Sequence, residues 1–161
     1  MKRVLSVLLA VCIIFSLSIG VFAATINISA DKSKINAGDE VTVSVKAADA
    51  MDKYFSFEYR LYFDATLFDL KVEKNEDDEY VSVGETNKYV TVSDKFTDSK
   101  GSYYKISALN NGKNFSIAAE ALIADLIFIA KSNIASTADA KFELVIKDSN
   151  RMNDETGSLV S

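Results

Sequence analysis

The residues best suited to chemistry lie at alternate positions of one stretch, residues 54–64. Successive side chains of a strand point to opposite faces, so this stretch divides into two sets. The first set combines a carboxylate, a guanidinium, a hydroxyl and two phenols: Tyr54, Ser56, Glu58, Arg60 and Tyr62. The second set is large and mostly apolar: Phe55, Phe57, Tyr59, Leu61 and Phe63. We therefore expect a long strand with one face in a core and the other facing water or a binding partner.

Composition excludes several kinds of catalytic and metal site. The chain has no His, and its one Cys is Cys12. Zinc sites of the usual kind, Ser-His-Asp catalysis and Cys-His catalysis all need these residues. A glycosidase needs two carboxylates, and 23 acidic residues make such pairs inevitable, yet none lies in a motif that would raise its pKa or shape a cleft. We predict that the protein is not an enzyme and that it has no cofactor and no metal site.

One charged loop leaves calcium open. Residues 73–79 read Glu-Lys-Asn-Glu-Asp-Asp-Glu. Clustered carboxylates can bind Ca²⁺, but this order lacks the glycine and the spacing of a known calcium loop. The favoured interpretation is a solvated loop.

The first 23 residues have the three parts of a secretory signal. Lys2 and Arg3 are followed by an apolar run, and the segment ends in Val21-Phe22-Ala23. We predict cleavage after Ala23, with Ala24 as the alternative. The other interpretation is an uncleaved anchor, because the run approaches the ~20 residues that span a bilayer. The protein is expected to be secreted, either free or at the cell surface.

The exported part, residues 24–161, has the length of one domain. Loss of Lys2 and Arg3 leaves 16 basic residues against 23 acidic ones, a net charge of −7. An acidic surface argues against nucleic acid and, after signal cleavage, against membranes as partners. With no Cys left, a hydrophobic core rather than disulfides must hold the domain.

Short alternating segments joined by polar turns predict an all-β domain. Residues 40–48 show the pattern best, with Val41, Val43 and Val45 on one face. Other expected strands are 25–30, 67–72, 80–83, 88–94, 103–109, 121–131, 140–148 and 158–161. About nine antiparallel strands without a long helix indicate a β-sandwich.

Residues 118–131 carry both helical and strand signals. A single helical turn near 118–121, leading into a strand, would satisfy both. The strand would place Leu122, Ala124, Leu126, Phe128 and Ala130 inside. Ile123, Ile127 and Ile129 would then form an outward apolar patch, which suggests a partner or a covering loop.

Several motifs, in order, resemble those of cohesin modules. The segment 35–45, Ile-Asn-Ala-Gly-Asp-Glu-Val-Thr-Val-Ser-Val, resembles their Gly-acidic turn and valine strand. Residues 62–68, Tyr-Phe-Asp-Ala-Thr-Leu-Phe, resemble their Tyr-Asp-Pro turn, with Phe63 in place of the Tyr and Ala65 in place of the Pro. Residues 120–128 resemble their later acidic, small and hydrophobic run, and the tail 142–150, which closes at residues 157–160, resembles their last strand and its hairpin.

This resemblance implies a jelly-roll sandwich that binds a dockerin module in an extracellular, polysaccharide-degrading assembly. It also implies that the partner lies on an open sheet face. Outward residues seven and five positions before the Tyr contribute there, which are Ser56 and Glu58 in this chain. Ser is shorter than the usual Asn and Glu is longer than the usual Asp, so the partner's identity does not carry over.

Further candidates extend the same face. Tyr54, Arg60 and Tyr62 lie on the same strand, and Tyr89, Thr91 and Ser93 on a neighbouring one. Three alternatives to a dockerin-binding face are an ordinary solvated face, a carbohydrate-binding module and a surface adhesion domain. A carbohydrate site usually stacks sugars on Trp, and this chain has no Trp, which leaves tyrosines such as Tyr103 and Tyr104.

Overall fold

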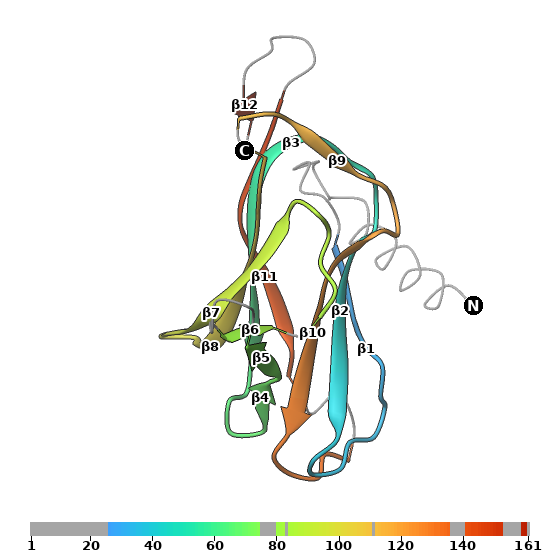
Figure 1. The fold of residues 1–161 in the computed structure, drawn as a ribbon, viewed down its shortest axis with the longest axis vertical. Coiled ribbons are helices and arrows are strands. Elements are labelled where there is room, and N and C mark those ends of the chain that lie inside the picture. Colours follow the sequence, from blue (N-terminus) through green and yellow to red (C-terminus); the bar gives the residue numbers. More distant parts are fainter. Residues whose placement is uncertain are drawn as a thin grey trace, which may run out of the picture.

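The computed structural model describes residues 26–74, 80–82, 84–110, 112–135, 141–152 and 159–160. Twelve strands and no helix lie within these residues. Two antiparallel sheets pack face to face with the core between them, as Figure 1 shows. The predicted leader, residues 1–23, and the acidic positions 75–79 lie outside the described part of the chain.

The larger sheet is organised around β3 (Met51–Phe63), which is 13 residues long. Its order is β12 (Leu159–Val160), β11 (Glu143–Met152), β3, β8 (Gly101–Leu109) and β7 (Val90–Asp98), and β9 (Phe115–Ile117) pairs with the start of β3. The long strand expected over residues 54–64 is therefore confirmed, although it begins three residues earlier. The sequence reading missed β9, which is only three residues long.

The smaller sheet has the order β1 (Ile26–Ala30), β2 (Glu40–Ala47), β10 (Leu122–Ala130) and β4 (Phe68–Leu70). A separate hairpin follows β4 and consists of β5 (Val72–Lys74) and β6 (Tyr80–Ser82). The valines of β2 are fully buried, as their alternation predicts. β-Branched residues suit this half-buried, pleated surface.

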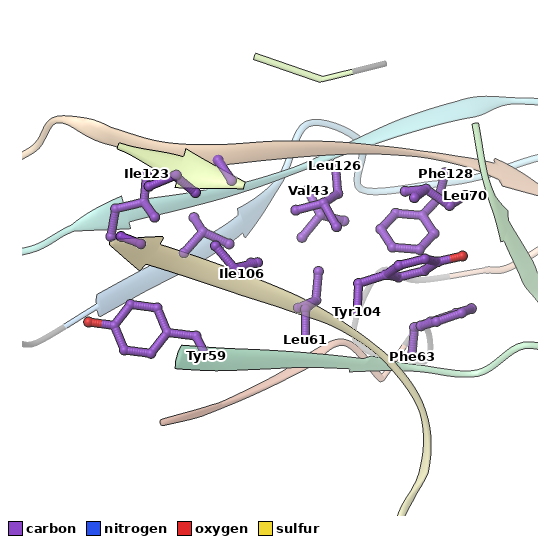
Figure 2. Close-up of a cluster of buried hydrophobic side chains, with 14 of the residues drawn as sticks. Val43, Tyr59, Leu61, Phe63, Leu70, Tyr104, Ile106, Ile123, Leu126 and Phe128 are labelled. Carbon is purple, nitrogen blue, oxygen red and sulfur yellow. The ribbon is translucent and has the colours of Figure 1, made fainter. Parts of the chain in front are cut away.

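Side chains from both sheets fill the space between them (Figure 2). Val43, Leu126 and Phe128 from the smaller sheet are fully buried, and so are Leu61 and Ile106 from the larger one. The rings of Phe63 and Phe128 bridge the two sheets, with centroids 5.2 Å apart. Apolar burial on this scale accounts for a domain without disulfides.

Residues 84–87 continue the edge of the smaller sheet beside β4. The Asp125 N–H donates to the Glu85 carbonyl (2.8 Å), and the Asn87 N–H donates to the Ile123 carbonyl (2.9 Å). The close approach needs a glycine, because a Cβ on Gly84 would lie 1.7 Å from the Asp125 carbonyl oxygen. This edge of the sandwich is thereby closed.

Two expectations for residues 118–131 are wrong. Instead of a helical turn, the Ala121 N–H donates to the Ala118 carbonyl in a tight turn in which Glu120 has a φ of 60°. A register shift between Leu122 and Ala124 then turns Ile123 into the core and leaves Leu122 only half-buried. Such a bulge reverses the alternation on one side of it. Ala124, Leu126, Phe128 and Ala130 point inward as expected, while the outward patch shrinks to Ile127 and Ile129.

No helix in the described ranges is long and apolar enough to cross a membrane.

Candidate functional site

The outward side of the larger sheet carries most of the candidate residues, and we call it the polar face. It is formed by Ser56, Glu58, Arg60 and Tyr62 of β3, Tyr103, Lys105 and Ser107 of β8, Thr91, Phe96 and Asp98 of β7, Lys100 of the β7–β8 turn and Glu143 of β11. In antiparallel strands, directly opposite residues point to the same face of the sheet, so these side chains form rows across the strands. Glu58 lies opposite Ser107, Arg60 opposite Lys105 and Tyr62 opposite Tyr103.

Arg60 holds two carboxylates together on the polar face. Its Nε donates to Glu58 Oε1 at 3.1 Å, and its Nη1 donates to Asp98 Oδ2 at 3.4 Å. The guanidinium carbon also lies 4.7 Å from the centre of the Tyr103 ring. A planar guanidinium can make both kinds of contact at once, so Arg60 fixes the geometry around it.

Tyr62 and the β7–β8 turn form the next row. The Tyr62 hydroxyl donates to Asp98 Oδ2 at 2.8 Å, and the Lys100 N–H donates to Asp98 Oδ1 at 2.9 Å. These two bonds favour the ionised carboxyl and lower the pKa of Asp98. Lys100 Nζ lies 4.9 Å from the centre of the Tyr62 ring and pairs with Glu143. Tyr62 is thus covered by its neighbours and is only 5% exposed.

Phe96 is the exposed aromatic residue of the face. Its ring stacks on Tyr103 with centroids 5.7 Å apart, and 40% of the residue stays exposed. Lys105 Nζ lies 4.5 Å from the centre of the Phe96 ring. Phe96 was not among the predicted residues, because the predicted strand ends at residue 94. A register shift between Val92 and Lys95 interrupts the alternation there, and the strand continues to Asp98.

Tyr54 does not belong to the polar face. It is 3% exposed and packs in the core, whereas Phe55 is only half-buried. The alternation fails because β3 has a bulge between Tyr54 and Ser56, where two steps along β3 lie opposite the single step from Asn150 to Arg151 on β11. The expectation that Tyr54 points outward is therefore wrong.

Of the three candidates near the start of β7, only Thr91 is exposed on the polar face. Thr91 is exposed on the face, opposite Ser107. Tyr89 is half-buried against the core, with its ring centroid 4.9 Å from that of Phe115. Ser93 lies in the irregular stretch of β7, where its hydroxyl accepts the Lys105 N–H at 3.1 Å.

A pocket of about 470 Å³ adjoins Tyr62 at the end of the face. The turn after β3 forms one wall, in which Asp64 Oδ1 accepts the Thr66 hydroxyl at 2.6 Å and the Thr66 N–H at 2.9 Å. These bonds, with a smaller contribution from Lys141, lower the pKa of Asp64. Lys141 also lines the pocket and has a φ of 51°.

No cluster of metal-ligating side chains is found in the described ranges. The acidic loop considered for calcium falls mostly on residues 75–79, outside them.

Two solved structures share this architecture. One is a chain in a crystal structure of a CaDoc0917–CaCohA2 complex in which CaDoc0917 carries a single substitution, with 20% identity over 85% of this chain and 92% of that one, at a TM-score of 0.50. The other is the seventh ScaB type I cohesin from Pseudobacteroides cellulosolvens, with 17% identity over 83% of each chain, at a TM-score of 0.52. The chain has the fold of a cohesin module.

The cohesin fold is a jelly-roll β-sandwich, so the expected fold class is confirmed. The turn at Asp64 closes the central strand of this cohesin fold at the position that the motif predicts. No protein-family model matches the sequence. No curated protein matches it either.

Proposed function

We propose that this protein is a secreted, non-catalytic module whose polar face binds a dockerin-like protein module. The observation that carries the proposal is the cohesin fold with an open sheet face around β3. One of the two structural neighbours is named as a type I cohesin, and the other was solved as a Doc–Coh complex. By the same resemblance, the assembly would be extracellular and would degrade polysaccharide.

The make-up of the polar face supports protein binding. All of its charged side chains except Lys105 belong to the Glu58–Arg60–Asp98 network or the Lys100–Glu143 pair, so the face is pre-organised before a partner arrives. Phe96 adds an exposed ring, and aromatic residues and Arg are enriched at protein interfaces. Ser56 and Glu58 are half-buried in the middle strand, where a flat partner surface would reach them.

Three carboxyl groups of the described residues are poorly suited to act as general acids. Hydrogen bonding lowers the pKa values of Asp39, Asp64 and Asp98. A general acid at neutral pH needs a raised pKa instead. This supports a binding role for the module.

The carbohydrate alternative is less well supported. Sugar stacking needs an exposed flat ring, but Tyr54, Tyr62, Tyr103 and Tyr104 are each at most 7% exposed. Tyr89 is half-buried, and Phe96 is the aromatic ring that stays exposed on the polar face. Polysaccharide binding is therefore the alternative result that the experiment below can detect.

The test is calorimetric titration against the dockerins encoded in the same genome. Ser56→Arg and Glu58→Arg place a long cation in the middle of the proposed interface and should weaken binding at least about tenfold. Matched controls carry the same changes on the outward side of the smaller sheet. These are Ser44→Arg, at a half-buried serine, and Glu40→Arg, at a glutamate paired with Lys71.

Two results would overturn the proposal. In one, no dockerin binds while an insoluble polysaccharide retains the protein. In the other, the β2 controls weaken dockerin binding as much as the β3 variants do, which would place the interface on the other sheet.

A further inference from the structure

The charged side chains of the polar face are not all neutralised in the same way. Most of them contact an opposite charge within the face, through the network around Arg60 or through the Lys100–Glu143 pair. Lys105 differs, because no carboxylate contacts its ammonium group in the described part of the chain. A partner can therefore still neutralise this positive charge.

The position of Lys105 on β8 explains this difference. It lies directly opposite Arg60 of β3, and like charges at such positions repel each other. The guanidinium of Arg60 is held by its two carboxylates. The side chain of Lys105 extends over the ring of Phe96 instead, with Nζ 4.5 Å from the ring centre. A ring attracts an exposed cation only weakly, so the ammonium group still depends on water.

Phe96 is well placed to anchor a partner. Its ring stacks on Tyr103, which in turn lies against the guanidinium of Arg60. The ring is therefore held in place before binding, yet 40% of the residue remains exposed. A rigid aromatic side chain loses little conformational freedom when it is covered, which makes such residues strong contributors to binding.

A partner that covers Phe96 also covers Lys105. Because Nζ lies 4.5 Å from the centre of the ring, a surface that packs on the ring removes water from the ammonium group as well. A buried ammonium group without a partner is costly, and a carboxylate at hydrogen-bonding distance offsets that cost. An entirely apolar surface therefore fits this part of the face poorly, and a basic surface fits it worse.

We infer that Phe96 and Lys105 select the partner of the polar face, and that this partner presents an apolar side chain to Phe96 and a carboxylate to Lys105. The inference rests on the proposed function and adds the chemistry of the bound module. Residues 24–161 are acidic overall, which at long range favours a basic partner. Lys105 imposes the opposite local requirement, so dockerins without an acidic residue at this place are discriminated against.

The test is calorimetric titration with each dockerin from the same genome that binds the wild-type chain. Lys105→Met removes the charge and keeps a side chain of similar length beside Phe96. Lys95→Met is its control, because Lys95 is exposed but lies opposite the inward-pointing Tyr104, on the other side of the same sheet. Phe96→Ala is matched with Ile129→Ala, since Ile129 is 38% exposed on the smaller sheet.

Both polar-face variants should weaken binding at least about tenfold, while both controls should bind within about twofold of wild type. The wild-type affinity should also fall as the salt concentration is raised from about 50 to 500 mM. Lys105→Met should show a smaller fall, because it has lost one charge pair with the partner. Circular dichroism spectra and melting temperatures close to those of wild type would show that the variants fold.

The inference fails on its own if Lys105→Met or Phe96→Ala binds like wild type in a dockerin complex that Ser56→Arg still weakens. It also fails on its own if Lys105→Met leaves the salt dependence unchanged. Absence of any dockerin binding would overturn both the inference and the proposed function. Retention of the wild-type chain on polygalacturonate that Lys105→Met abolishes would assign the two residues to an acidic polysaccharide and would also overturn the inference.

Discussion

Two tyrosines three positions apart on β3 have opposite environments. Tyr62 points outward and donates its hydroxyl to Asp98. Tyr59 points into the core, and its Oη is buried without a hydrogen-bond partner among the described residues. Burial also raises the pKa of Tyr59. The two hydroxyls should therefore make contributions of opposite sign to stability.

Tyr59→Phe should raise the free energy of unfolding by about 1 kcal/mol, because it removes a buried polar atom that has lost its water. Tyr62→Phe is the matched change and should lower the free energy of unfolding, because it removes the Tyr62 donor and leaves the Asp98 carboxylate with Arg60 and the Lys100 N–H alone. Urea unfolding at neutral pH measures both. Equal losses for the two variants would mean that the Tyr59 hydroxyl does have a partner in solution.

The free energy of unfolding should depend on pH in part through the ionisation of Asp98. Its pKa is lower in the folded chain than in the unfolded one, owing first to Tyr62 and then to the Lys100 N–H. The ionised carboxyl therefore stabilises the fold above about pH 4, and this contribution disappears as the pH falls through the folded pKa.

Asp98→Asn should be less stable than wild type at pH 7, and the gap should narrow as the pH falls below about 4. Thermal melts across this range measure the effect. Asp52→Asn, at an exposed position on β3, controls for the change in net charge. A gap that persists unchanged at low pH would contradict the assignment.

At single positions, the sequence predicted the polar face where β3 is regular. Simple alternation identified Ser56, Glu58, Arg60 and Tyr62 correctly as outward residues. It failed for Tyr54 and Ile123, because a register shift lies beside each of them, against β11 for Tyr54 and against β2 for Ile123. A bulge depends on the partner strand, and one sequence does not reveal that partner.

Among the elements, the edge formed by residues 84–87 depends on close backbone contact. Gly84→Ala would place a Cβ against the Asp125 carbonyl, where only backbone movement can relieve the clash. We expect a loss of roughly 2 kcal/mol or more, measured by urea unfolding. Glu85→Ala, whose exposed side chain can be removed without touching its carbonyl, should cost under ~0.5 kcal/mol. Similar losses for both would show that the edge tolerates separation from β10.

The strands were predictable where they are long and regular, as for β2, β3 and β8. Three-residue strands such as β9 are too short to show a period. The extension of β7 to Asp98 was hidden by its irregular stretch, and this concealed Phe96 as a member of the face. The cohesin-like turn motif helped most, because it anchored the end of β3.

For the whole molecule, the predicted leader would set the first residue of a secreted chain. Intact-mass measurement on secreted protein should give a first residue of Ala24, or of Thr25 if cleavage follows Ala24. Retention of Lys2 and Arg3 in the extracellular fraction would contradict the predicted signal. An otherwise identical chain with the Ala23→Arg change should be cut poorly, because a small residue is needed at that position.

The central place of β3 also governs how the chain can fold. Tyr62 pairs with Tyr103 on one side and with Glu143 on the other, and both partners are synthesised much later. Contacts between such distant positions slow folding, because long loops must close first. Until β11 arrives, the aromatic inner side of β3 lacks part of its cover and is exposed to aggregation. We therefore expect the polar face to be one of the last surfaces to form, and a truncation before β11 should remove the whole face rather than one of its edges.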